Sequence, residues 1–204
     1  SYYPLNSHIL YAATLLMKDE KSAKLLNWAF AMLTVWLTFS FGKKYFSKNS
    51  GILAAALFLA TPMVLLVASR ACIELPLAFF ETLAVFCFIN WYEGRRDRWF
   101  YLSAVFMGMA IGSKYTSGSA MISVFVMLTA VYFIEFMEKR SIADAVAGLV
   151  KKGAVYSMII FAVISPWFVK NYFDVGNPIY PFKLSGAKGV EQLSKAVKVT
   201  LGPK

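Results

Sequence analysis

The sequence predicts an all-α protein: a bundle of about six membrane-spanning helices, preceded by one helix that lies at the membrane surface. Hydrophobic residues make up 59% of the 204 residues and charged residues only 16%, which is too apolar for an ordinary soluble domain. Several apolar stretches also run for most of the roughly 20 residues that a helix needs to cross a bilayer. The composition therefore places the chain among polytopic membrane proteins.

The elements follow from where the apolar stretches begin and end. Residues 2–17 are apolar but short, as in an interfacial helix. The predicted spans cover residues 23–41, 51–60, 75–91, 99–112, 117–136 and 153–168.

Two stretches between the spans need separate predictions. Thr61-Pro62 should end the second span, because proline has no amide hydrogen and clashes with the preceding turn. We expect residues 63–72, which include Arg70, to form a re-entrant or surface-lying connection, and the polar residues 138–152 could hold a short surface helix.

The basic residues set the predicted orientation. The formal charge of +10 would suit a nucleic-acid partner, but its residues stand in short clusters between spans. We therefore expect membrane lipids and no nucleic acid around this chain. The positive-inside rule places the loops after the first, third and fifth spans in the cytoplasm; these loops carry Lys43, Lys44, Lys48, Arg95, Arg96, Arg98, Lys139, Arg140, Lys151 and Lys152.

Candidate functional residues gather at the opposite, outer ends of the spans. An ionisable group in the hydrocarbon region costs several kcal/mol, so one that persists there usually faces a cavity or a partner. The candidates are Arg70, Glu74, Lys114 and Tyr115, with Lys170 and Asn171 near them and Glu81 deeper in the membrane. Arg70 and Glu74 are four residues apart and would share one face if the chain were helical there.

These residues have two interpretations. Arg70 and Glu74 could form a structural ion pair, and Lys114 could mark a span end by reaching toward the interface. Alternatively, Arg70 and Lys114 bind an anionic head group while Glu74 orients Arg70, since arginine and lysine are the usual phosphate ligands. The position of Lys114 on the outer side favours the second interpretation. The sequence shows no metal-ligand spacing, catalytic triad or glycine-rich phosphate loop, so we expect no metal and no cofactor.

Several motifs, taken together, resemble one family. They are Tyr3-Pro4-Leu5, Ala60-Thr61-Pro62, Ile73-Glu74-Leu75-Pro76, Gly112-Ser113-Lys114-Tyr115-Thr116, Pro166-Trp167 and Gly176-Asn177-Pro178-Ile179-Tyr180-Pro181-Phe182. In order and spacing they are similar to the C-type glycosyltransferase superfamily, specifically the family 39-like enzymes, which include protein mannosyltransferases and the lipid A aminoarabinose transferase. Lys114 matches the Gly-x-Lys-Tyr element of that family, and Glu74 falls where its members usually carry a carboxylate.

The resemblance implies a polyprenyl- or dolichyl-phosphate sugar as donor and an active site on the extracytoplasmic face of the cell membrane. It also implies metal-independent transfer, with a carboxylate base in the first extracytoplasmic loop. That base is expected upstream of Ser1, so the chain would be a fragment that is itself inactive. Where the aminoarabinose transferases carry a lysine, this chain has Tyr3.

The combined prediction is a partial transmembrane glycosyltransferase-like region over residues 1–182, followed by an extracytoplasmic tail or surface helix over residues 183–204. In an inverting transfer, Arg70 and Lys114 would neutralise the departing phosphate, where cations stabilise the transition state most. Sugar and acceptor stay open. The main alternative is a transporter or flippase for a lipid-linked or anionic substrate, which should show inverted repeats or discontinuous spans. An O-antigen polymerase or ligase, with larger arginine-rich outer loops, and a non-enzymatic scaffold are further alternatives.

Overall fold

The computed structural model describes residues 6–17, 20–139 and 141–178, and every regular element within these ranges is a helix. The predicted all-α fold is therefore confirmed. In chain order the helices are α1 (Asn6–Met17), α2 (Glu20–Tyr45), α3 (Lys48–Ala60), α4 (Pro62–Ala68), α5 (Glu74–Gly94), α6 (Asp97–Ile111), the short 3-10 helix η1 (Tyr115–Ser117), α7 (Gly118–Lys139) and α8 (Ile142–Val175).

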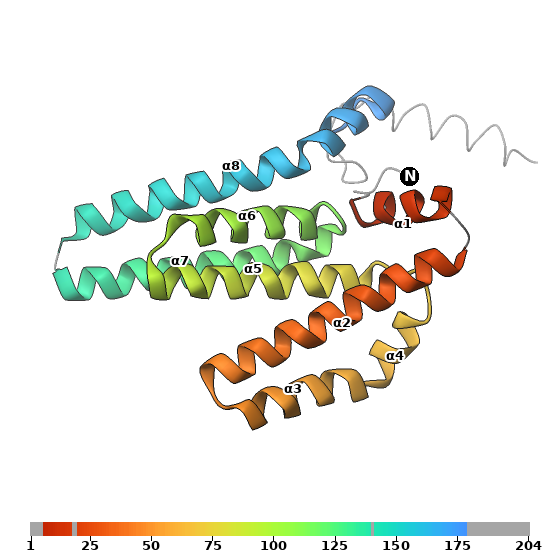
Figure 1. Cartoon of the computed structure of the whole chain (residues 1–204). Coiled ribbons are helices and arrows are strands. Elements are labelled where there is room, and N and C mark those ends of the chain that lie inside the picture. Colours follow the sequence, from red (N-terminus) through yellow and green to blue (C-terminus); the bar gives the residue numbers. More distant parts are fainter. Residues whose placement is uncertain (1–5, 18–19, 140, 179–204) are drawn as a thin grey trace, which may run out of the picture.

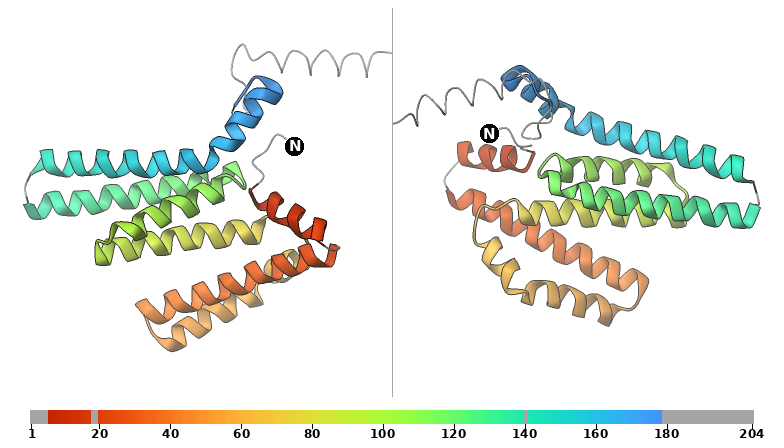
Figure 2. Two further views of the ribbon diagram at one scale, coloured as in Figure 1. Left: turned by 45° about the horizontal axis from the view of Figure 1, so that its top comes forward. Right: turned by 180° about the vertical axis from the view of Figure 1, so that it is seen from behind.

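The long helices lie side by side and run back and forth along one direction (Figure 1). Helices α5, α6, α7 and α8 pack together, α2 packs against α5, and α3 packs against α2 (Figure 2). We call the end where α5 and α7 begin the Lys114 end, and the opposite end, where α6 and α8 begin, the Lys152 end. The short α1 packs on α2 and lies at the Lys114 end.

The number of spans is lower than the sequence predicted. Within the described residues, four helices, α2, α5, α7 and α8, are long and apolar enough to cross a membrane, and the bent pair α3 and α4 could supply a fifth. The predicted fourth span corresponds to α6, whose 15 residues reach only about 22 Å, short of a ~30 Å hydrocarbon core. The prediction of about six spans therefore becomes four or five for the part of the chain that the structure describes.

The break between α3 and α4 occurs at the predicted residues. Thr61 adopts an extended backbone conformation, as residues before proline usually do, and Pro62 opens α4. The two helices meet at an angle of 64°. This geometry is that of a broken span or a re-entrant loop. The sequence predicts a re-entrant or surface-lying connection for residues 63–72.

Helix α8 replaces two predicted elements. No separate surface helix forms within residues 142–152, because α8 already starts at Ile142, after the Ser141 side chain caps the amide of Asp144. The sixth predicted span, residues 153–168, is also shorter than the helix, since α8 continues past Pro166 to Val175. Figure 2 shows the C-terminal part of α8 turned away from the rest of the helix. The predicted tail, residues 183–204, lies outside the described residues.

Helices α5 and α6 contribute to both hydrophobic clusters of the bundle. One cluster joins them to α7 and α8, and the other joins them to α2 and α4. Helix α6 can lie centrally because Gly108 lets α8 approach closely: a Cβ at this position would lie 2.8 Å from the Val163 Cβ. Small residues at such contacts are typical of membrane helix packing. The short α6 thus contributes to both clusters in the middle of the bundle.

Candidate functional site

The four predicted site residues all lie at the Lys114 end. Glu74 is the first residue of α5, and Lys114 stands between α6 and η1. Tyr115 is the first residue of η1, and Arg70 lies in the loop between α4 and α5. Chain segments far apart in sequence therefore meet at this end, because α6 brings the chain back to where α5 begins.

Glu74 and Lys114 form the one charged pair that the structure brings together from the predicted set. The Lys114 Nζ lies 3.6 Å from the Glu74 Oε1, and their side chains are 42% and 49% exposed. Charge-assisted hydrogen bonds are shorter, about 2.7–2.9 Å. The two charges therefore attract each other without being joined by a hydrogen bond, and Lys114 keeps ammonium donors for another partner.

Arg70 does not share a helical face with Glu74. Helix α4 ends at Ala68 and α5 begins at Glu74, and the residues between them are not helical. The four-residue spacing therefore does not place Arg70 and Glu74 on one helical face. Among the described residues, no ion pair joins Arg70 to Glu74. The Arg70 side chain is exposed, while its backbone carbonyl is held by a hydrogen bond from Asn27 Nδ2 at 2.6 Å.

Two residues that hold this loop were not among the predicted site residues. Asn27 of α2 is fully buried, and its Nδ2 also donates to the Val67 carbonyl oxygen at 2.8 Å. The Tyr11 hydroxyl lies 2.8 Å from Asn27 Oδ1 and 2.6 Å from the Cys72 carbonyl oxygen, two acceptors for its one hydrogen. Burial raises the pKa of the Tyr11 phenol well above its ordinary value, so the hydroxyl stays protonated and donates.

The turn that carries Lys114 is held from α1. The backbone amide of Asn6 donates to the Gly112 carbonyl oxygen at 3.0 Å, and the Ser7 hydroxyl donates to Ser113 Oγ at 2.7 Å. The Trp167 indole of α8 donates to Asn6 Oδ1 at 2.6 Å. Gly112 is required by this close approach, because a Cβ there would overlap the Asn6 side-chain amide. The N-terminal segment is thus docked on the bundle, although its sequence suggested only an interfacial helix.

The remaining candidates at this end have structural surroundings. Tyr115 is partly buried and packs against the cluster formed by α5 to α8. Lys170 pairs with Asp174 one turn further along α8, at 2.6 Å. Asn171 is buried, with its Nδ2 at 3.5 Å from the Pro178 carbonyl oxygen. Glu81 is partly buried on α5, two turns after Glu74.

The Lys152 end presents its charges differently. Three ion pairs there each join two segments of the bundle: Lys44 of α2 with Glu93 of α5, Arg95 just after α5 with Glu135 of α7, and Lys152 of α8 with Asp97 of α6, at 2.6, 2.6 and 2.5 Å. The Lys152 ammonium also lies 5.0 Å from the centre of the Phe100 ring, within cation–π range. These charges hold helices together.

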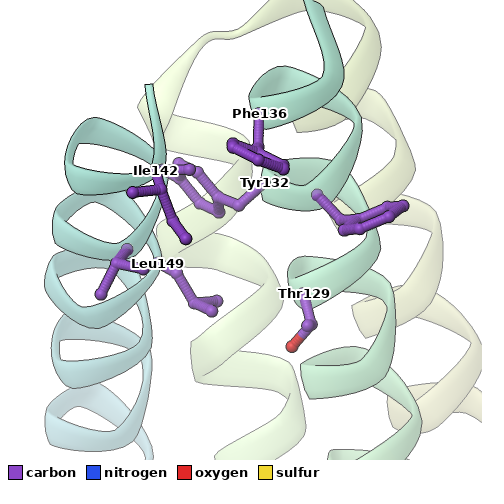
Figure 3. Close-up of a pocket in the computed structure, with 8 residues that line it drawn as sticks. Thr129, Tyr132, Phe136, Ile142 and Leu149 are labelled. Carbon is purple, nitrogen blue, oxygen red and sulfur yellow. The ribbon is translucent and has the colours of Figure 1, made fainter. Parts of the chain in front are cut away.

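A cavity of about 260 Å³ opens between α7 and α8 near the Lys152 end, away from the predicted site. Figure 3 shows Ile142 and Leu149 of α8 facing Tyr132 and Phe136 of α7 across it. Its lining is almost wholly apolar. Such a groove within the membrane suits hydrocarbon and offers nothing to a phosphate. The described residues also contain no cluster of three His, Cys, Asp or Glu side chains that could hold a metal ion.

Comparison with known proteins gives one match. The family model described as dolichyl-phosphate-mannose-protein mannosyltransferase matches residues 4–169 of this chain. No curated protein and no solved structure matches it. The matched region contains α1, the Arg70 loop, Glu74 and the Lys114 turn.

Proposed function

Because the chain belongs to the dolichyl-phosphate-mannose-protein mannosyltransferase family, we propose that its Lys114 end binds the phosphate of a lipid-phosphate sugar donor. The family consists of membrane glycosyltransferases that use a dolichyl-phosphate-linked sugar. Lys114 and Arg70 are the proposed phosphate ligands. Glu74 keeps Lys114 in place, and Tyr115, which follows Lys114 directly, borders the site.

The 3.6 Å separation of Lys114 and Glu74 is the observation that carries this proposal. Lys44 and Lys152 at the opposite end lie 2.6 and 2.5 Å from their carboxylates. Lys114 is instead oriented by a carboxylate that does not bind it directly. An ammonium held this way can donate hydrogen bonds to phosphate oxygens. The exposed Arg70 guanidinium adds a second cation at the same end.

In the proposed transfer, the bond between the sugar's anomeric carbon and the phosphate oxygen breaks, and its electron pair leaves with the lipid phosphate. The oxygen of the acceptor hydroxyl bonds to the anomeric carbon from the opposite face and gives its proton to a base. Negative charge therefore grows on the phosphate, where Lys114 and Arg70 stabilise it. The anomeric configuration is inverted. Neither acceptor nor base is assigned to a residue of this chain.

The distribution of basic residues supports an extracytoplasmic location for this site. Residues 43–48, 95–98 and 151–152 contribute lysines and arginines to the Lys152 end. The positive-inside rule places that end in the cytoplasm and the Lys114 end on the other side of the cell membrane. The sugar would then be transferred outside the cytoplasm.

The test is loss of transfer when the two cations are removed. Lys114→Ala and Arg70→Ala in the full protein should each lower the rate of lipid-phosphate release from a dolichyl-phosphate sugar about 100-fold, the usual effect of removing a group that stabilises transition-state charge. Lys151→Ala and Arg96→Ala, which remove exposed cations at the opposite end, are the matched controls. Unchanged turnover in both Lys114→Ala and Arg70→Ala, with normal membrane insertion, would contradict the proposed binding of the donor phosphate.

A further inference from the structure

Helix α1 contacts both chain segments that carry the proposed phosphate ligands. Its first turn bonds to the loop that carries Lys114. The backbone amide of Asn6 donates to the Gly112 carbonyl oxygen, and the Ser7 hydroxyl donates to Ser113 Oγ. Its second turn holds the Arg70 loop, through the Tyr11 hydroxyl, which lies 2.6 Å from the Cys72 carbonyl oxygen.

The two contacts lie on one face of α1. Ser7 and Tyr11 are four residues apart, which puts them on the same side of a helix about 6 Å apart along its axis. They are also the two buried residues among the α1 side chains that the structure describes, whereas Ile9 and Leu16 are 54% and 89% exposed. The buried contacts of α1 with the two loops are therefore polar, and they stand beside the apolar contact of Leu10 with the cluster that includes α2 and α4.

Asn27 extends the second contact to Arg70 itself. Its side chain links Tyr11 on one side to the backbone carbonyls of Val67 and Arg70 on the other. All of these bonds join neutral groups, so neither salt nor moderate pH change weakens them. The Arg70 backbone is fixed while its guanidinium stays exposed.

We propose that α1 is a strut that sets the spacing between the Arg70 loop and the Lys114 turn, with Tyr11 and Ser7 as positioning residues for donor binding. The role in donor binding rests on the proposed function. The mechanical part does not, because it concerns only whether a change at one end of α1 loosens the loop at the other end.

The chain contains its own reporter for this loop. Cys72 lies in the Arg70 loop as a free, partly buried thiol, while the second free thiol, Cys87, is buried within α5. Labelling of the full protein in membrane vesicles with a maleimide measures how often the loop opens. Cys72→Ala supplies the background from Cys87.

Tyr11→Phe should raise the Cys72 labelling rate about fivefold, the effect of losing one hydrogen bond of ordinary strength. Ser7→Ala should raise it as well, although Ser7 contacts Ser113 and not the Arg70 loop. Tyr156→Phe is the matched control, because it also removes a buried tyrosine hydroxyl, here bonded to Ser103 in the α6–α8 interface. It should leave Cys72 labelling unchanged.

A second readout tests the role in positioning. Tyr11→Phe should raise KM for the dolichyl-phosphate sugar about fivefold with kcat changed less, and this effect should disappear in an Arg70→Ala background if Tyr11 acts through Arg70.

The outcomes separate the two proposals. Wild-type Cys72 labelling in Ser7→Ala would overturn the strut, whatever the enzyme's activity. A Tyr11→Phe effect of equal size with and without Arg70 would overturn Tyr11 as a positioning residue. Unchanged turnover of both Arg70→Ala and Lys114→Ala would instead contradict the proposed function.

Discussion

The Lys152 end and the Lys114 end of the bundle hold their charged side chains in opposite ways. At the Lys152 end, three close ion pairs join α2 to α5, the residue after α5 to α7, and α6 to α8. At the Lys114 end, neutral hydrogen bonds from α1 and α2 hold the loops. The Arg70 side chain is exposed there, Lys114 lies 3.6 Å from Glu74, and the close pair of Lys170 with Asp174 stays within α8. The difference teaches that ion pairs join neighbouring segments of the bundle at the Lys152 end, whereas neutral hydrogen bonds join them at the Lys114 end.

The neutral network gives the largest expected effect on stability. Asn27→Leu would leave the Val67 and Arg70 carbonyl oxygens without the amide that they share. We expect a loss of about 3 kcal/mol in the free energy of unfolding, since each buried unsatisfied group costs about 1–3 kcal/mol. Unfolding in detergent measures this loss. Asn90→Leu, which removes a partly buried amide at the Lys152 end, should lower the free energy of unfolding by less. An equal loss would contradict the difference between the two ends.

The next effect concerns the docking of α1 on the Lys114 turn. Gly112→Ala should destabilise the protein by about 2 kcal/mol, because the added methyl group displaces Asn6 from a tightly packed contact. Gly118→Ala is the control, since a Cβ there meets no atom within 4 Å. Comparing the thermal unfolding of the two variants checks the prediction. If both unfold together with the wild type, α1 does not press on Gly112.

At the Lys152 end, removing a cation should reduce stability and leave chemistry alone. Lys152→Met breaks the pair with Asp97 and the contact with the Phe100 ring. We expect a loss of about 1 kcal/mol in the free energy of unfolding, with normal sugar transfer by folded protein. A large loss of sugar transfer without loss of stability would contradict a purely structural role for the charges at the Lys152 end.

The smallest effect is expected for the open pair. Glu74→Gln should change the free energy of unfolding by less than about 0.5 kcal/mol, because both side chains of this pair are nearly half exposed and separated by 3.6 Å. Chemical denaturation of Glu74→Gln beside the wild type measures the change. A loss above about 1 kcal/mol would class Glu74 and Lys114 with the structural pairs of the opposite end.

The sequence predicted those features that depend on local chain properties. Apolar runs located the long helices, and the missing amide of Pro62 located the break between α3 and α4. The span count failed at α6, because its apolar residues were counted without its length. The sixth span failed in the opposite direction: α8 continues past Pro166 to Val175, and its C-terminal part turns away without ending the helix (Figure 2).

The candidate site was predicted in its members but not in its contacts. Charge in an apolar sequence singled out Glu74 and Lys114, which the structure brings together across 40 positions of the chain. The link between Arg70 and Glu74 assumed a helix, and loop conformation cannot be read from periodicity. Asn27 was missed although a polar amide within an apolar span is itself a signal. That the catalytic base lies upstream of Ser1, and that the site binds donor, stay predictions.

Binding of the donor lipid tests the central claim most directly. The dissociation constant of dolichyl phosphate can be measured for the full protein in lipid nanodiscs, with Lys114→Met and Lys152→Met compared as folded proteins. We predict that Lys114→Met weakens binding at least about tenfold, the effect of losing one charged hydrogen bond, and that Lys152→Met stays within about twofold of the wild type. Equal affinities for Lys114→Met and the wild type would contradict the account.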